Sequence, residues 1–134
     1  MQLTPELQKQ LIDTAVQVRD WAYAPYSKYH VGAALLTASG KVYDGVNIEN
    51  AVYPLGLCAE RVAIFKAVSE GEREFVAIAI ATENAGMPCG SCRQVMAEFG
   101  LSMRVIVVDT SGIIHFESTV DGLLPGAFTP KDLI

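Results

Sequence analysis

The chain has 134 residues, of which 51% are hydrophobic and 19% are charged, and its formal net charge is −5. This length and composition are typical of one compact globular domain, so we expect residues 1–134 to form a single domain. The acidic charge argues against a general nucleic-acid-binding surface, and no apolar run approaches the roughly 18 residues of a membrane span.

Helix and strand signals follow one another in the first half of the chain. Thr4 and Pro5 are a hydroxyl N-cap and a first-turn proline, and they predict a helix that runs to about residue 21. Two β-prone runs, residues 31–37 and 41–46, flank a Ser-Gly turn and predict a β-hairpin. An irregular loop is expected over residues 51–57.

Helices alternate with strands in the second half of the chain. The predicted elements are a helix from Cys58 to about residue 70, a strand at 75–81, a helix from about 89 to 99, strands at 104–109 and 113–117, and a short helix at 120–124. The strand–helix–strand order predicts a parallel pair with a right-handed crossover. We therefore expect an α/β fold, a three-layer α/β/α sandwich with a mixed five-stranded sheet and helices on both faces.

All three cysteines lie at the starts of the two longer helices of this second half. Cys58 begins the first, and Cys89 and Cys92 form a C-x-x-C at the start of the second. The positive end of a helix dipole favours the thiolate over the thiol. The N-terminus shows no signal-peptide pattern, which indicates the reducing cytoplasm, where cysteines bind metal or do chemistry more often than they pair. Three thiolates leave one position of Zn²⁺ open, as catalytic sites do, so we predict one zinc per chain.

Charged residues stand directly beside the cysteines. Glu60, two residues after Cys58, is the candidate general base and acid, able to take a proton from a zinc-activated water and pass it to a leaving amine. The alternative is a first-turn glutamate that the helix dipole favours. Arg61 and Arg93 follow the two cysteine segments. We expect one or both to donate a hydrogen bond to a ligand sulfur, the alternative being solvated helix-face charges.

The order Cys-Ala-Glu, a strand, then Pro-Cys-x-x-Cys is more specific than either segment alone. A lone C-x-x-C also fits a structural zinc knuckle or a thioredoxin-type redox pair. The combined pattern marks the zinc nucleobase deaminases. On these segments, and on Asn47-Ile48-Glu49-Asn50 and Leu123-Leu124-Pro125-Gly126-Ala127-Phe128, the chain resembles the small homotetrameric cytidine deaminases over nearly its whole length. The resemblance implies hydrolytic removal of the 4-amino group of cytidine and 2′-deoxycytidine, with release of ammonia, in pyrimidine salvage.

The resemblance also implies roles for five residues that bind the nucleoside. Asn47 and Glu49 would bond the 3′-hydroxyl of the sugar, although Asn47 capping a turn is an equal reading of the residue alone. The backbone N–H of Ala59 would meet the substrate carbonyl, and Tyr29 would stack on the base. Tyr29 is a departure, because Tyr-His stands where the family often has Phe-Pro. Phe128 would reach the active site of a neighbouring subunit, which places the sites near the interfaces of a homotetramer.

Three other functions compete with this interpretation. A deaminase of a related cytosine nucleoside, such as blasticidin S, is the nearest, and the Asn47 and Glu49 pair argues against it. An enzyme that edits polynucleotides is disfavoured by the acidic charge. A non-catalytic zinc-stabilised module is disfavoured because structural zinc sites are closed by four ligands.

Overall fold

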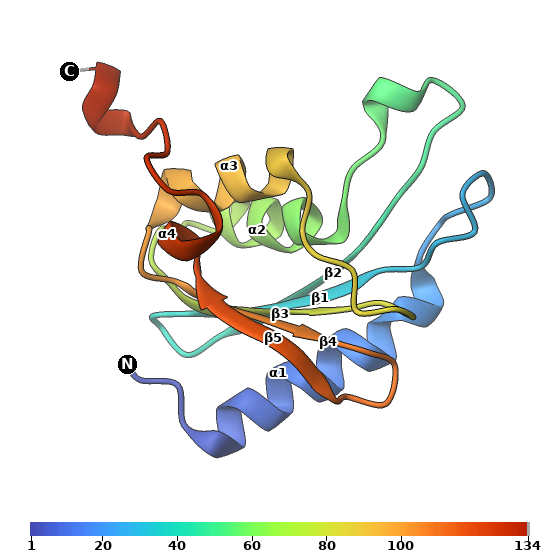
Figure 1. Ribbon diagram of the computed structural model, residues 1–134, viewed down its shortest axis with the longest axis horizontal. Coiled ribbons are helices and arrows are strands. Elements are labelled where there is room, and N and C mark those ends of the chain that lie inside the picture. Colours follow the sequence, from blue (N-terminus) through green and yellow to red (C-terminus); the bar gives the residue numbers. More distant parts are fainter. Residues whose placement is uncertain (134) are drawn as a thin grey trace.

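A mixed five-stranded sheet, in the order β2-β1-β3-β4-β5, forms the middle layer of the computed structural model, which describes residues 1–133 (Figure 1). The strands are β1 Gly32–Thr37, β2 Val42–Val46, β3 Phe75–Ala81, β4 Arg104–Val108 and β5 Ile114–Thr119. The helices are α1 Pro5–Val18, α2 Ala59–Ser69, α3 Gly90–Phe99 and the short α4 Val120–Leu123. The three-layer α/β/α prediction is confirmed.

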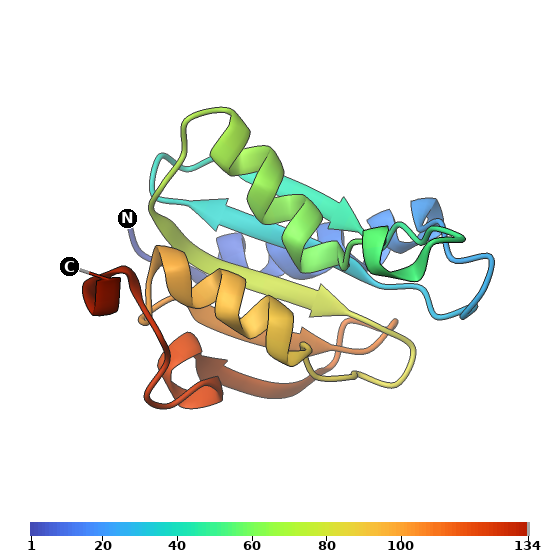
Figure 2. The same ribbon diagram turned by 90° about the horizontal axis from the view of Figure 1, so that it is seen from above.

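The two faces of the sheet carry different helices. Helix α1 packs on one face, where Leu11 and Ala15 join Leu36, Ala79 and other buried residues of β1, β3 and β4. Helices α2 and α3 lie side by side on the opposite face, as Figure 2 shows. The strands between them have apolar side chains on both faces, as a doubly covered sheet requires.

Strand direction explains why the two cysteine segments meet. Strands β1 and β2 pair antiparallel, as the hairpin prediction requires, and β1 also pairs antiparallel with β3. Strands β2 and β3 therefore run the same way and end at the same edge of the sheet. Because each is followed by a loop and a helix, the N-termini of α2 and α3 both lie at that edge, where ligand sites of α/β sheets form. The predicted parallel pair of β3 and β4 is confirmed.

The observed boundaries depart from the predicted ones at a few points. The first helix ends as an α-helix at Val18 and continues as a 3-10 turn over Arg19–Trp21. The last strand begins and ends later than predicted and leads directly into α4. The loop at 51–57 contains a 3-10 turn at Tyr53–Leu55, and two isolated bridges join Ile48 to Tyr23 and to Leu57. No helix within residues 1–133 is long and apolar enough to cross a membrane.

Candidate active site

The three cysteine sulfurs converge at the N-termini of α2 and α3. Cys58 is the N-cap of α2, Cys89 is the N-cap of α3, and Cys92 lies in the first turn of α3. The Sγ atoms of Cys58 and Cys89 are 4.0 Å apart, and those of Cys89 and Cys92 are 3.5 Å apart. A tetrahedral Zn²⁺ with Zn–S bonds of about 2.3 Å holds its sulfurs about 3.8 Å apart. The three thiols therefore fit a zinc ion, and residues 1–133 offer no other cluster of His, Cys, Asp and Glu with this spacing.

The electrostatics of the cluster favour sulfur in its anionic form at Cys58. A hydrogen bond from Cys92 and the Arg61 guanidinium, whose Nη2 lies 3.3 Å from the Cys58 sulfur, lower the pKa of Cys58 to about 5. The same hydrogen bond, together with burial and the nearby Glu60, raises the pKa of Cys92. Cys89 Sγ accepts from the backbone N–H of Cys92 at 3.5 Å and so caps the first turn of α3.

Arg61 stands as the sequence predicts, whereas Arg93 does not. Arg61 donates to the Cys58 sulfur, and its buried Nε has no hydrogen-bond partner within residues 1–133. Arg93 instead donates from Nε to the carbonyl of Pro88 at 2.8 Å and from Nη1 to that of Leu123 at 2.9 Å. The prediction that one or both arginines bond a ligand sulfur is thus met by Arg61 alone. The side chain of Arg93 ties the start of α3 to α4.

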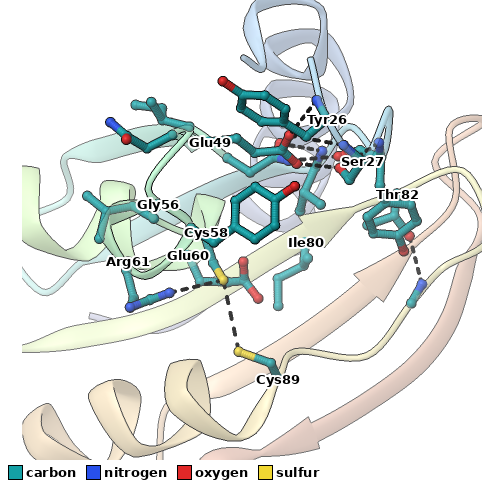
Figure 3. A pocket seen from close by; sticks show the side chains of 18 of the residues that line it. Tyr26, Ser27, Glu49, Gly56, Cys58, Glu60, Arg61, Ile80, Thr82 and Cys89 are labelled. Atoms are coloured by element: carbon teal, nitrogen blue, oxygen red, sulfur yellow. Dashed lines mark hydrogen bonds between the residues drawn. The ribbon is translucent and has the colours of Figure 1, made fainter. Parts of the chain in front are cut away.

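Glu60 is a buried carboxyl at the floor of the pocket. It is the second residue of α2, only 4% of its surface is exposed, and it lies beside Cys58 and Arg61 in Figure 3. Burial is the main cause that raises the pKa of Glu60 to about 7, and the negative Cys58 adds to it. A carboxyl that gains and loses its proton near neutral pH is suited to move protons in catalysis.

The pocket in front of Glu60 has a volume of about 630 Å³, which is within the range of small-molecule sites. Its lining comes from the loop after α1, the segment after β2, the start of α2 and the loop after β3. Apolar and aromatic side chains form the walls. The polar groups are Ser27, Asn47, Glu49, Asn50, Glu60, Arg61, Thr82 and the thiols of Cys58 and Cys89.

Asn47 and Glu49 both lie in this pocket, and both also hold the loop that follows α1. Glu49 Oε1 accepts from the backbone N–H groups of Tyr26 at 3.0 Å and Ser27 at 3.1 Å, and Oε2 accepts from the Ser27 hydroxyl. The Ser27 hydroxyl is the main cause of the lowered pKa of Glu49. Asn47 accepts from the N–H of Val31 at 2.9 Å and donates to the carbonyl of Tyr29 at 2.7 Å. The turn-capping interpretation of Asn47 thus describes real contacts, and each side chain still has capacity for a further hydrogen bond.

The remaining predicted residues fall inside and outside the pocket. Tyr29 lines it, and Ala59 is the first residue of α2, whose N–H has no acceptor within the helix. Phe128 is 56% exposed and lies outside the residues that line this pocket. Sequence reasoning gave no role to Ser27, although it stands in the Ala24-Pro25-Tyr26-Ser27 segment that the family shares, and it missed Thr82, which follows β3 directly and belongs to no motif.

Comparison with known proteins places these features in a family. Residues 5–109 match the family model described as the cytidine and deoxycytidylate deaminase zinc-binding region. A cytidine deaminase of Sporosarcina psychrophila is 51% identical over 128 residues, covering 93% of this chain and 93% of the relative. The crystal structure of the Burkholderia pseudomallei cytidine deaminase superposes with a TM-score of 0.85 at 47% identity, covering 90% of this chain and 98% of that one. A blasticidin-S deaminase of Bacillus cereus is only 27% identical, over 90% of this chain and 91% of the relative.

Proposed function

The chain belongs to the cytidine and deoxycytidylate deaminase family, and from that premise we propose that it hydrolyses cytidine and 2′-deoxycytidine to uridine and 2′-deoxyuridine with release of ammonia. The observation that carries the proposal is that three thiols meet at zinc-binding distance, and that two of them, Cys58 and Cys89, line one pocket together with a buried carboxyl. Structural zinc sites have four protein ligands and need no acid beside them, whereas hydrolytic sites need both an open position and a proton carrier.

In the proposed site Cys58, Cys89 and Cys92 hold one zinc ion per chain. Bound zinc supplies Lewis acidity, which makes a water molecule acidic enough to act as a nucleophile near neutral pH. Three thiolates would weaken that effect through their negative charge. Arg61 offsets part of it, because its guanidinium already donates to the Cys58 sulfur.

Glu60 carries the protons in the proposed reaction. Its carboxylate accepts a proton from the attacking water and donates it to N3 of the pyrimidine while the oxygen bonds to C4. The carboxylate then accepts the remaining proton of the hydroxyl group at C4 and donates it to the 4-amino group, so that the C4–N bond breaks, the C4 carbonyl forms and ammonia leaves. The raised pKa of Glu60 supports this role, since a carboxyl with an ordinary pKa gives up a proton easily but takes one up poorly at neutral pH.

The other pocket residues bind and orient the nucleoside in this proposal. Asn47 and Glu49 bind the 3′-hydroxyl, with the loop contacts described above keeping both side chains in place. The N–H of Ala59 meets the substrate carbonyl, and the Tyr29 ring stacks on the base. Binding a hydroxyl with a buried amide and a carboxylate beside it discriminates against analogues that lack the hydroxyl.

Assembly and location complete the proposal. We infer a homotetramer of single-domain chains, residues 1–134, in which Phe128 of one subunit closes the pocket of another. The exposed aromatic side chains of Tyr26 and Tyr53, whose ring centroids are 5.8 Å apart, support an interface, since apolar groups gathered on a surface mark contact sites. A cytoplasmic location fits three free thiols, which need reducing conditions to bind metal. A role in pyrimidine salvage follows from the proposed substrates, cytidine and 2′-deoxycytidine.

The test is an ultraviolet assay of cytidine loss on protein whose zinc content is measured in the same sample. Wild-type protein with about one zinc per chain should convert cytidine, and Glu60→Gln should keep its zinc while losing nearly all turnover, because glutamine cannot carry a proton. Blasticidin S is assayed beside cytidine. Turnover of blasticidin S without turnover of cytidine would reassign the substrate, and active protein free of zinc would refute the metal chemistry.

A further inference from the structure

Tyr29 is held at both its main chain and its side-chain hydroxyl. Its N–H donates to the Ser27 hydroxyl at 3.0 Å, and its carbonyl accepts from Asn47 at 2.7 Å. The hydroxyl at the far end of the ring donates to Asn84 Oδ1 at 2.7 Å, across 55 positions of sequence. A residue that only presented an aromatic face would not need this last contact, and a phenylalanine at position 29 could not make it.

The acceptor Asn84 belongs to a small directional network in the loop that joins β3 to α3. The backbone N–H of Gly86 donates to Thr82 Oγ1 at 2.7 Å, and Thr82 Oγ1 donates in turn to Asn84 Oδ1 at 3.3 Å. Thr82 is almost fully buried, so its hydroxyl needs partners within the protein. Each donor in the network has one acceptor, and Asn84 Oδ1 accepts hydrogen bonds from the hydroxyls of both Thr82 and Tyr29. The asparagine is thereby oriented before any substrate binds.

Gly86 shows that the tyrosine hydroxyl and this loop are fitted to each other. A Cβ built on Gly86 would lie 2.3 Å from the Tyr29 hydroxyl oxygen but 3.6 Å from the ring carbon that carries it. Gly86 does not have a positive φ, so its backbone conformation is open to other residues. The space taken by the Tyr29 hydroxyl is therefore the main obstacle to a side chain at position 86.

We propose that Tyr29 and Asn84 are positioning residues that join the loop of the sugar site to the loop leading into Cys89, through a contact that we call the Tyr29–Asn84 clasp. The inference rests on the proposed function, since it assigns the clasp to nucleoside binding. The clasp holds the Tyr29 ring as a fixed wall of the pocket, so the substrate does not have to order the wall when it binds. The hydrogen bonds of the two clasp residues go to Ser27, Asn47 and Thr82 and to each other, so we expect the effect to fall on binding and to leave the chemical step unchanged.

Kinetics of the single and double variants test this assignment. Tyr29→Phe and Asn84→Ala should each raise KM for cytidine by roughly 3- to 10-fold, with kcat within about twofold of wild type, because each removes the same hydrogen bond. Asn84→Ala also removes the acceptor of the Thr82 hydroxyl, so the double variant should match Asn84→Ala, since the Tyr29–Asn84 bond can be lost only once. Tyr23→Phe is the matched control: Tyr23 is also exposed, and its hydroxyl makes no hydrogen bond within residues 1–133.

A second comparison uses the fit at Gly86. Gly86→Ala should raise KM and lower the melting temperature in the wild-type background, and Tyr29→Phe should restore most of the lost melting temperature by removing the clashing oxygen. Two results would overturn the clasp. One is additive effects of Tyr29→Phe and Asn84→Ala on KM, and the other is an equal loss of melting temperature from Gly86→Ala in the wild-type and Tyr29→Phe backgrounds. The melting temperatures do not depend on turnover. A wild type inactive on cytidine would therefore count against the proposed function and against the binding role of the clasp. The melting temperatures of the Gly86→Ala variants would still test the Tyr29–Asn84 contact itself.

Discussion

Gly45 determines how closely α2, which carries Cys58 and Glu60, packs on the sheet. The residue lies in β2 beneath the first turns of α2. A Cβ at this position would lie 2.4 Å from the carbonyl oxygen of Ala59 and 2.6 Å from the backbone nitrogen of Ala63. Both are main-chain atoms of a helix, so no side-chain rotation can relieve the contact.

The size of the effect of Gly45→Ala follows from these distances. Ordinary contact begins near 3.4 Å, so the start of α2 must move about 1 Å from the strand to accept the methyl group. Forced packing of this kind costs roughly 1–3 kcal/mol of the free energy of unfolding. A displacement of about 1 Å in a catalytic group can lower kcat on the order of 100-fold. Cys58 and Glu60 both lie at the displaced end, so we expect losses of stability and of kcat together.

Gly32→Ala is the matched control, because it adds the same methyl group on the opposite face of the sheet, which α1 covers. A Cβ at Gly32 would lie 2.0 Å from the carbonyl oxygen of Ala15 in α1, which carries no residue of the site. Urea unfolding should show lowered stability for both variants. Cytidine turnover per zinc-loaded, folded chain should fall steeply only for Gly45→Ala. Equal kcat in the two variants would refute the argument that Gly45 sets the position of the catalytic residues.

Three further predictions concern charge and metal. Cys92→Ser should reduce bound zinc to well below one per chain and lower the melting temperature, as metal analysis and thermal unfolding can check. A chelator should lower the melting temperature of the wild type to nearly that of the variant. Arg61→Gln should weaken zinc affinity or activity by roughly 10- to 100-fold, measured by competition with a zinc dye and by turnover, because it removes the positive charge from the Cys58 sulfur. A hydrogen bond from His115 is the main cause of the lowered pKa of Asp109, so that contact stabilises the fold above the unfolded pKa of about 3.9 and is lost as the pH falls through the lower folded pKa. Asp109→Asn should therefore lower the urea midpoint at pH 7, and the difference from wild type should begin to shrink below about pH 4 and vanish only below the lower folded pKa; a constant difference would contradict the assignment.

Features that depend on a few adjacent residues were predictable from the chain alone. The Thr4-Pro5 helix start, the hairpin around residues 39–40 and both cysteine helices were placed within a few residues of their observed bounds. Local signals suffice there, because caps, turns and helix periodicity are formed by neighbours in sequence. The parallel β3–α3–β4 unit also followed, since connection length and handedness leave few alternatives.

Contacts between distant segments were beyond the reach of such signals. Arg93 was a candidate for a sulfur contact because it follows a ligand segment, yet its guanidinium donates to two carbonyls, one of them 30 residues away. The contact between Tyr29 and Asn84 spans 55 residues and has no motif of its own. Which of several polar groups a long side chain meets is decided by the packing of whole elements.

Local sequence signals were enough to predict the chemical parts of the candidate site: three thiols, one carboxylate and one arginine, each beside a predicted helix N-terminus. They were enough because the spacing of ligands within one turn is local. The tertiary structure decided that these parts meet, since only the common direction of β2 and β3 brings α2 and α3 to one edge. It also decided that Asn47 and Glu49 support the pocket loop they line, and that Gly45 and Gly86 leave the space on which the site depends.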